Sequence, residues 1–133
     1  SSIPDLKIIT TCGGFDPVHV GHVRCFIETA KLKSRFKNSV FVIIANGDGF
    51  LETKKGFVFM PQPERLEILH SFKGVDHVVL WYDGTQNCTG AIEKIRPNIF
   101  TKGGDRSTRV SLLYFSLIDM NLVNSVSQFV HLY

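Results

Sequence analysis

The chain has 133 residues, of which 44% are hydrophobic and 20% are charged, and its formal net charge is +3 at pH 7. This composition is typical of a globular protein, and the length fits a single domain over residues 1–133. The small charge and scattered basic residues argue against a nucleic-acid partner. No apolar run reaches the roughly 20 residues that cross a bilayer, so no membrane partner is expected.

The cysteines indicate a reducing compartment. Cys12, Cys25 and Cys88 are irregularly spaced and form no Cys-x-x-Cys pair, which fits free thiols better than a disulfide framework. The sequence also lacks a cationic start followed by an apolar core and a cleavage site. We therefore expect a cytoplasmic protein.

The first predicted elements are a strand, a turn and a helix. Residues 7–12 are β-branched and apolar enough for a buried strand, and Gly13 and Gly14 permit a tight turn after it. A helix follows at once and ends near Lys33. Its predicted apolar stripe consists of Val20, Val23, Ile27 and Ala30.

His19 and His22 lie in the first turn of this helix, where free N–H groups and the helix dipole favour an anion. Two imidazoles at such a place suggest phosphoryl chemistry. The pattern alone leaves two alternatives open: a structural or capping role, and half of a zinc site. No third zinc ligand is suggested by the spacing.

The later elements alternate between strands and helices. Residues 39–45 form a continuous apolar strand that ends at Asn46, and a loop carrying Lys54 and Lys55 leads to a helix near Pro61. The apolar side of that helix is Leu66, Ile68, Leu69 and Phe72. A strand over 75–81, a helix over 89–95 and a strand over 98–101 follow. This order predicts an α/β fold with a Rossmann-like, doubly wound parallel sheet, whose ligands bind beyond the carboxyl ends of the strands.

The tail from 110 to 133 has a weaker pattern. Leu112, Leu113, Phe115 and Leu117 indicate apolar packing, whereas Val123 and residues 126–130 fit either an edge strand or a second helix. The short chain and the aromatic residues of this tail predict a homodimer. Those aromatic residues are Tyr114, Phe115, Phe129 and Tyr133.

The segment from Gly13 to His22 resembles the Gly-x-Phe-Asp-x-x-His-x-Gly-His signature of the cytidylyltransferase-like nucleotidyltransferase superfamily. The resemblance implies that His19 and His22 contact the α-phosphate and bridging oxygens of a nucleoside triphosphate that carries Mg²⁺. It also implies that Gly13, Gly14, Phe15 and Asp16 take part in binding the nucleotide. Asp16 is expected to cap the helix or to orient a neighbour.

The middle of the chain continues the resemblance with Asn46-Gly47-Asp48, Lys55-Gly56 and Glu64-Arg65. The resemblance implies that Lys55 projects toward phosphates and serves catalysis and the acceptor, since an ammonium suits a phosphate as a point charge. Without it, Lys55 would be an ordinary solvated lysine. Arg65 is expected either to bind the acceptor's phosphate or to pair with Glu64 or Asp76.

The segment from Arg96 to Asp105 is similar to the Pro-Asp-x-x-x-Lys-Gly-Gly-Asp segment of the heptose-phosphate adenylyltransferase branch, with Asn98 in place of aspartate. The resemblance implies that Lys102 and Gly103 lie near phosphates and that Asp105 faces the nucleoside. Arg106, where relatives often have an aromatic residue, joins the nucleotide-binding set. This branch favours ATP over CTP.

The resemblance covers about residues 7–106, and it departs from the superfamily in two places. Gly14 stands where many relatives have threonine or cysteine, and residues 110–133 hold no clear copy of a second, Ser/Thr-rich signature. The leading hypothesis is transfer of a nucleoside monophosphate to a small phosphorylated acceptor such as a sugar phosphate. The alternatives are a cytidylyltransferase acting on a polyol or alcohol phosphate and a catalytically impaired nucleotide-binding module.

Overall fold

The computed structural model describes residues 5–82, 84, 88–103, 110–114 and 130–132. In chain order the elements are β1 (Lys7–Gly13), α1 (Val20–Lys33), β2 (Ser39–Asn46), α2 (Asp48–Lys55), α3 (Gln62–His70), β3 (His77–Trp81), α4 (Thr89–Ile95), β4 (Ile99–Gly103), β5 (Val110–Tyr114) and β6 (Val130–Leu132).

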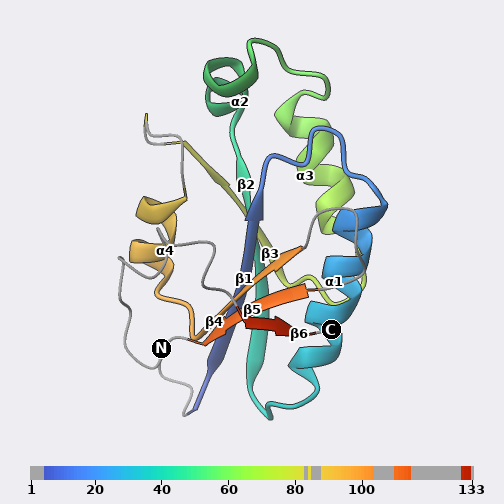
Figure 1. Cartoon of the computed structure of the whole chain (residues 1–133), viewed down its shortest axis with the longest axis vertical. Helices are drawn as coiled ribbons and strands as arrows, with labels where there is room; N and C mark the ends of the chain where they lie inside the picture. Colours follow the sequence, from blue (N-terminus) through green and yellow to red (C-terminus); the bar gives the residue numbers. More distant parts are fainter. Residues whose placement is uncertain (1–4, 83, 85–87, 104–109, 115–129, 133) are drawn as a thin grey trace.

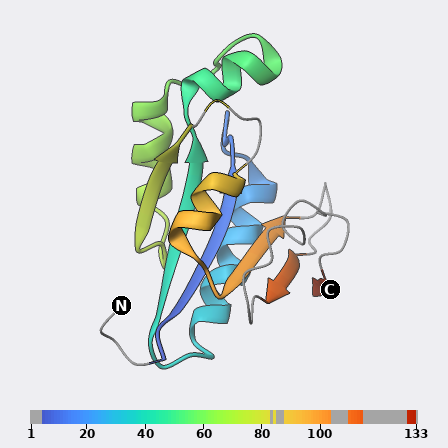
Figure 2. The ribbon, with the colours of Figure 1, turned by 90° about the vertical axis from the view of Figure 1, so that its left-hand side faces the viewer.

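The strands form one sheet in the order β3-β2-β1-β4-β5-β6. The first four are parallel, and β5 and β6 extend the β4 edge in the antiparallel direction. Helices α1 and α3 cover one face of the sheet and α4 covers the other (Figures 1 and 2). The predicted doubly wound, Rossmann-like parallel sheet is therefore confirmed over β1 to β4.

The tail contributes strands where the sequence indicated only apolar packing and an edge strand or second helix. β5 pairs with β4, and β6 pairs with β5. The other tail residues named above lie outside the described residues: Phe115, Leu117, Val123, residues 126–129 with Phe129, and Tyr133.

The core has a layer on each face of the sheet. On the face of α1 and α3, Phe15 and Phe26 pack with Phe41 and Ile43, and all four are buried. On the α4 face, Ile44 belongs to a second cluster beneath the helix. Ile43 and Ile44 point to opposite faces, as neighbours in a strand do, which explains why the β2 sequence is apolar without interruption.

The predicted apolar stripe of α1 is wrong in phase. Val20 is 60% exposed and Ile27 is 50% exposed. The buried side chains are instead Cys25, Phe26, Thr29 and Leu32. Thr29 is buried because its hydroxyl forms a hydrogen bond of 2.9 Å with that of Thr101 on β4, so the inward face of the helix is partly polar.

The predicted loop around Lys54 and Lys55 is also wrong, because both residues belong to helix α2. Gly47 is its N-cap, and Gly56 ends it in the left-handed region with φ of 83°. Glycine is common at both positions, so these residues mark the ends of a helix and not a loop. The helix lies beyond the carboxyl end of β2, at the top of Figure 1.

At the opposite end of the sheet, Asn98 joins the start of β4 to β1 by two hydrogen bonds. The Ile8 N–H donates to Asn98 Oδ1 at 2.9 Å, and the Asn98 N–H donates to the Ile8 carbonyl at 2.8 Å. An amide oxygen accepts here as a carboxylate would, which makes asparagine a conservative replacement for aspartate.

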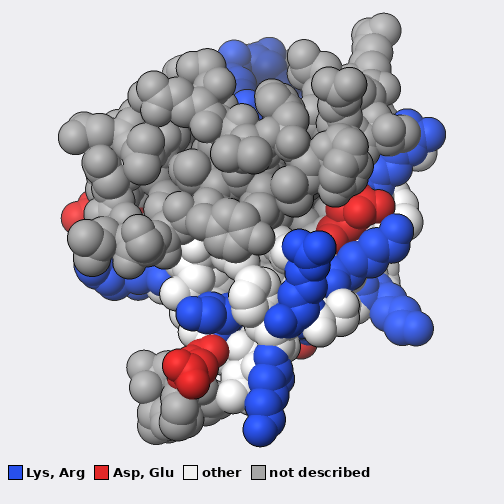
Figure 3. All heavy atoms as spheres, turned by 60° about the horizontal axis from the view of Figure 1, so that its bottom comes forward, with Lys and Arg blue, Asp and Glu red and all other residues white. Residues whose placement is uncertain are grey.

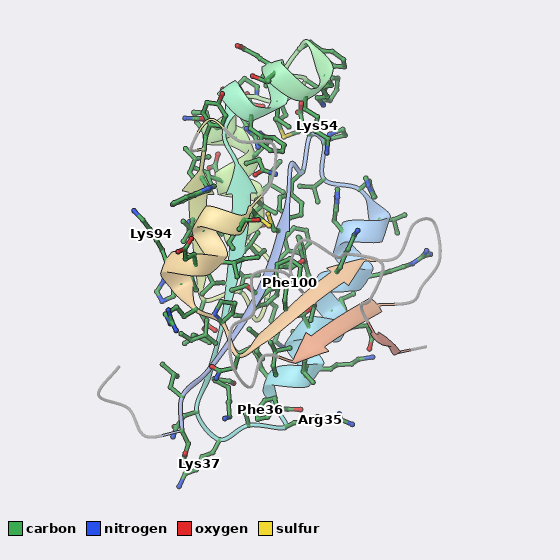
Figure 4. All side chains as sticks on the ribbon, turned by 60° about the vertical axis from the view of Figure 1, so that its left-hand side comes forward. Arg35, Phe36, Lys37, Lys54, Lys94 and Phe100 are labelled. Carbon is green, nitrogen blue, oxygen red and sulfur yellow. The ribbon has the colours of Figure 1, made fainter. Side chains whose placement is uncertain are left out.

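Basic side chains at this end stand in separate groups beside acidic ones (Figure 3). Arg35 and Lys37 project from the turn between α1 and β2 (Figure 4). Within the described ranges, no helix has both the length and the apolar character needed to span a membrane.

Candidate functional site

The turn after β1 is built around Phe15, which is 3% exposed and has a φ of 54°. A positive φ is strained for a bulky residue and persists only where the surroundings compensate for it. Burial of the ring provides that compensation. A Cβ on Gly13 would lie 3.0 Å from the ring, so Gly13 leaves the space that Phe15 fills. Phe15 thus lies in the core under the turn, where it supports the residues above it.

His19 and His22 cap helix α1 reciprocally. The Gly21 N–H donates to His19 Nδ1 at 3.1 Å, and the His19 N–H donates to His22 Nδ1 at 3.0 Å. The two rings stack with their centroids 3.7 Å apart. Because Nδ1 of each ring accepts a hydrogen bond, the single N–H proton of each imidazole is assigned to Nε2. The cap therefore presents two Nε2–H donors.

Gly21 is required by the position of the His19 ring. A Cβ at Gly21 would come within 2.9 Å of His19 Cε1 and 3.1 Å of Nδ1. Any side chain there would push the ring away from the cap. The glycine between the histidines therefore has a steric reason in this chain.

His22 stays neutral near pH 7. Burial and the neighbouring His19 together lower the pKa of His22 from 6.5 to about 4. The Phe15 ring contributes to this burial, since it meets the His22 ring edge-on at a centroid distance of 4.8 Å. His22 is thus suited to donate a hydrogen bond without carrying a charge of its own.

Asp16 does not cap the helix, because His19 is the N-cap. Its carboxylate accepts from the Phe59 N–H at 2.8 Å and from the Met60 N–H, and it forms an ion pair of 2.7 Å with Lys55. Burial alone would raise the pKa of Asp16, but the hydrogen bonds from Lys55, Phe59 and Met60 bring the pKa below its usual value. Of the two expected roles, Asp16 therefore has that of orienting its neighbours.

Lys55 is the last residue of α2 and reaches the turn through Asp16. Its Nζ donates to the carbonyl of Asp16 at 3.0 Å as well as pairing with the carboxylate. The ammonium also lies 4.8 Å from the centre of the Phe57 ring. A lysine has three N–H donors. The two contacts with Asp16 therefore leave, within the part of the chain that the structure describes, one N–H donor that could bind a phosphate oxygen. Lys54, one residue earlier, lies instead over the Phe50 ring.

Arg65 is fully buried on α3, at 0% exposure. Its N–H groups donate to Met60 O at 2.9 Å, Gly14 O at 2.7 Å, Asn46 O at 2.6 Å and Asp48 Oδ1 at 2.7 Å. The guanidinium thus joins the turn after β1 to the ends of β2 and α2. This arrangement favours a structural role over contact with an acceptor.

The expected partners of Arg65 were wrong. It pairs with Asp48 and not with Glu64 or Asp76, and Asp76 pairs with Lys33 at 2.6 Å. No role was predicted for Asp48, although a site residue of a parallel sheet is expected just beyond the carboxyl end of a strand, and Asp48 lies two residues after the end of β2.

Lys102 and Gly103 end β4 beside β1, since Thr101 is the register partner of Thr11. The predicted site residues Asp105 and Arg106 lie outside the described residues. In the described part of the chain, no three His, Cys, Asp or Glu side chains are grouped as a metal site. The structure therefore brings Lys55 to the turn from Gly13 to Asp16, which leads into the histidine cap, and it places β4 next to β1 in the sheet.

The comparisons with known proteins identify the family of the chain. Residues 10–117 match the cytidylyltransferase-like family, so the chain belongs to this family of nucleotidyltransferases. The predicted superfamily is thereby confirmed.

Among curated proteins, the chain is 36% identical over 101 residues to the bifunctional protein HldE of Aliarcobacter butzleri, which covers 74% of the chain and 20% of that protein. It is 34% identical over 103 residues to the bifunctional protein HldE of Citrifermentans bemidjiense, covering 76% of the chain and 20% of that protein. The chain thus spans about a fifth of the length of these relatives.

Among solved structures, a lipopolysaccharide core biosynthesis protein from Thermoplasma volcanium GSS1 superposes with a TM-score of 0.63 at 20% identity. The match covers 93% of this chain and 91% of that one. At this identity the likeness concerns the fold.

Proposed function

We propose that the chain transfers a nucleoside monophosphate from a nucleoside triphosphate to a small phosphorylated acceptor and releases pyrophosphate. The observation that carries this proposal is the histidine cap of α1, which offers two Nε2–H donors beyond the carboxyl end of a parallel sheet. Membership of a nucleotidyltransferase family supports it.

The chemistry asks for positioning and charge stabilisation. The acceptor's phosphate oxygen attacks the α-phosphorus in line, and pyrophosphate departs on the opposite side. His19 and His22 donate from Nε2 to oxygens whose negative charge grows in the transition state. Because these donors are held by the cap, they need no reorganisation during the reaction.

Mg²⁺ is proposed to enter with the triphosphate as part of the substrate. The oxygens of Asp16 are occupied by Lys55 and by the N–H groups of Phe59 and Met60, and Asp48 Oδ1 accepts from Arg65. These carboxylates are poorly placed to hold a divalent cation by themselves. The phosphate oxygens of the nucleotide are the usual ligands in such reactions.

Lys55 is proposed to bind the acceptor's phosphate or the departing phosphates, because its ammonium lies against the turn from Gly13 to Asp16, called the signature turn below. A sugar phosphate as acceptor and ATP as donor are supported by the resemblance of the Arg96 to Asp105 segment to the heptose-phosphate adenylyltransferase branch. The relatives named bifunctional protein HldE are in line with this choice.

The test is pyrophosphate release by the chain with Mg²⁺, using ATP or CTP against a panel of sugar phosphates and polyol phosphates. We expect release with ATP and a sugar phosphate. Faster release with CTP and a polyol phosphate would replace this proposal by the cytidylyltransferase alternative. A nucleotide-induced rise in melting temperature without any release would indicate a binding module.

A further inference from the structure

Two thiols from distant parts of the chain meet beneath α4. Cys12 lies near the end of β1, directly before the signature turn, and Cys88 is the N-cap residue of α4. Their side chains are joined by a hydrogen bond, and both are partly exposed. Both also pack on one apolar cluster, Ile44, Ala91, Ile92 and Phe100. Phe100 is labelled beside α4 in Figure 4.

The two sulfur atoms differ in their tendency to ionise. The hydrogen bond from Cys12, together with the charge of Lys102, lowers the pKa of the Cys88 thiol. The same hydrogen bond, with burial, raises the pKa of the Cys12 thiol, although the positive charge of Lys54 opposes the rise. Lys54 lies near the carboxyl end of β1 (Figure 4). Cys88 is therefore the better nucleophile, and Cys12 is a thiol held beside it.

Cys25 provides a contrast within the same chain. It is 4% exposed on the α1 face of the sheet, and its sulfur lies 3.9 Å from the hydroxyl of Thr11. Burial raises the pKa of the Cys25 thiol. The sheet thus separates Cys25 from the pair beneath α4.

We propose that Cys12 and Cys88 form an oxidation site, at which a peroxide or a small-molecule disulfide converts the thiol pair into a reversible disulfide bond. The proposal rests on a pair of contacting thiols and is independent of the proposed function. A disulfide bond needs the sulfur atoms about 2.05 Å apart, so two thiols in hydrogen-bond contact must still move toward each other before the bond can form.

With hydrogen peroxide the reaction has two steps. The Cys88 thiolate attacks one peroxide oxygen, the O–O bond breaks, and the departing hydroxide takes a proton to become water, which leaves a sulfenic acid on Cys88. The Cys12 sulfur then attacks the Cys88 sulfur, and the hydroxide that leaves takes the Cys12 proton as a second water. The two sulfurs lose two electrons, which reduce the peroxide.

The experiment exposes the reduced full chain to hydrogen peroxide, blocks remaining thiols by alkylation in denaturant, and maps the peptides by mass spectrometry. We expect a linked Cys12–Cys88 peptide that dithiothreitol removes, with Cys25 recovered in its alkylated form. The Cys25→Ser variant is the matched control. In this variant the Cys12–Cys88 disulfide should form at a rate within about twofold of that in the unchanged chain.

The single variants test the order of the steps, once circular dichroism shows that they are folded. In Cys12→Ser, a sulfenic acid on Cys88 should be trapped by dimedone. In Cys88→Ser, Cys12 should react at least about tenfold more slowly. Links to Cys25 as abundant as the Cys12–Cys88 link would overturn the proposal. Oxidation of Cys88 to sulfinic acid without pairing in the unchanged chain would overturn it as well.

Discussion

The histidine cap of α1 and the buried Arg65 lie close together in the fold, but they differ in how many of their N–H groups the protein itself uses. Both come from segments that resemble the family's motifs, and both place cationic or donor groups near the signature turn. In the cap, His19 is exposed, and in the part of the chain that the structure describes each ring forms its hydrogen bond through Nδ1. Arg65 is at 0% exposure, and its three nitrogens donate to four protein oxygens.

This difference indicates which groups are suited to contact a ligand and which groups hold the site in shape. A donor that is to bind a phosphate must keep an N–H group outside the protein's own hydrogen bonds, and among the described residues the cap does so. A guanidinium whose N–H groups are used by Gly14, Asn46 and Asp48 fixes the position of three segments instead. The following predictions test this division, beginning with the largest effect.

Arg65→Met should destabilise the fold by about 4 kcal/mol, because it leaves a carboxylate and three carbonyl oxygens without their buried donor. Urea denaturation followed by circular dichroism measures this loss. Arg35→Met, at the exposed turn after α1, is the control and should change stability by less than about 0.5 kcal/mol. Full stability of Arg65→Met with weakened acceptor binding would instead place Arg65 in the ligand site.

His19→Ser and His22→Gln should each lower turnover by about a hundredfold or more, equivalent to about 2.7 kcal/mol of transition-state stabilisation. Serine suits an N-cap, and glutamine at the third helical position restores the reciprocal bond, so both variants keep the cap. Their unfolding free energies should change by less than about 1 kcal/mol.

The alanine variants of the same residues separate the two roles of each histidine. His19→Ala and His22→Ala should lose turnover to the same extent and should also lose about 1 kcal/mol of stability with the cap. Near-normal pyrophosphate release by the cap-preserving variants would remove the histidines from the chemistry.

Lys55→Ala should lower turnover with the acceptor by about tenfold or more, whereas Lys54→Ala should have little effect. The reason is that Lys55 contacts the signature turn through Asp16, while Lys54 contacts Phe50. Steady-state kinetics with the acceptor varied will show whether KM or kcat carries the loss. Equal and small losses in both variants would return Lys55 to a purely structural role.

Stability should fall as the pH drops from about 6.5 toward about 4, since the pKa of His22 is lowered over that interval. In this window His22 binds a proton in the unfolded chain but stays neutral in the folded chain, so acid favours unfolding. The loss of stability that His22 causes is complete once the pH is below about 4. Urea denaturation at a series of pH values measures the slope. His22→Gln should give a flatter curve, and an unchanged slope would mean that His22 does not cause it.

Much of the fold could be predicted because its signals are local. The apolar run of β2 and the strand, turn and helix at the start of the chain need no knowledge of distant residues. The phase of α1 could not be predicted, since the buried hydroxyl of Thr29 finds its hydrogen-bond partner in Thr101 on the distant strand β4. Helix α2 was missed, although the glycines at its two ends are common at the ends of helices.

The site shows the same limit. The histidine pair and the turn could be found from their spacing, and the steric need for Gly21 follows the same local logic. The partners of Asp16 and Arg65 could not be found, because they lie on other elements, and no periodicity connects Asp16 to Phe59 or Arg65 to Gly14. Burial of a charged side chain is decided by such distant partners.

The bonds of Asp16 also say something about the order in which the molecule folds. Its contacts with Lys55, Phe59 and Met60 span 39, 43 and 44 residues. Closing chain segments of this length costs entropy that short helical contacts do not, so such contacts are gained late unless other pairing has already joined the ends. Pairing of β1 with β2 brings those ends together. We therefore expect the signature turn to acquire its final shape after the sheet, with low φ-values at Asp16 in folding kinetics.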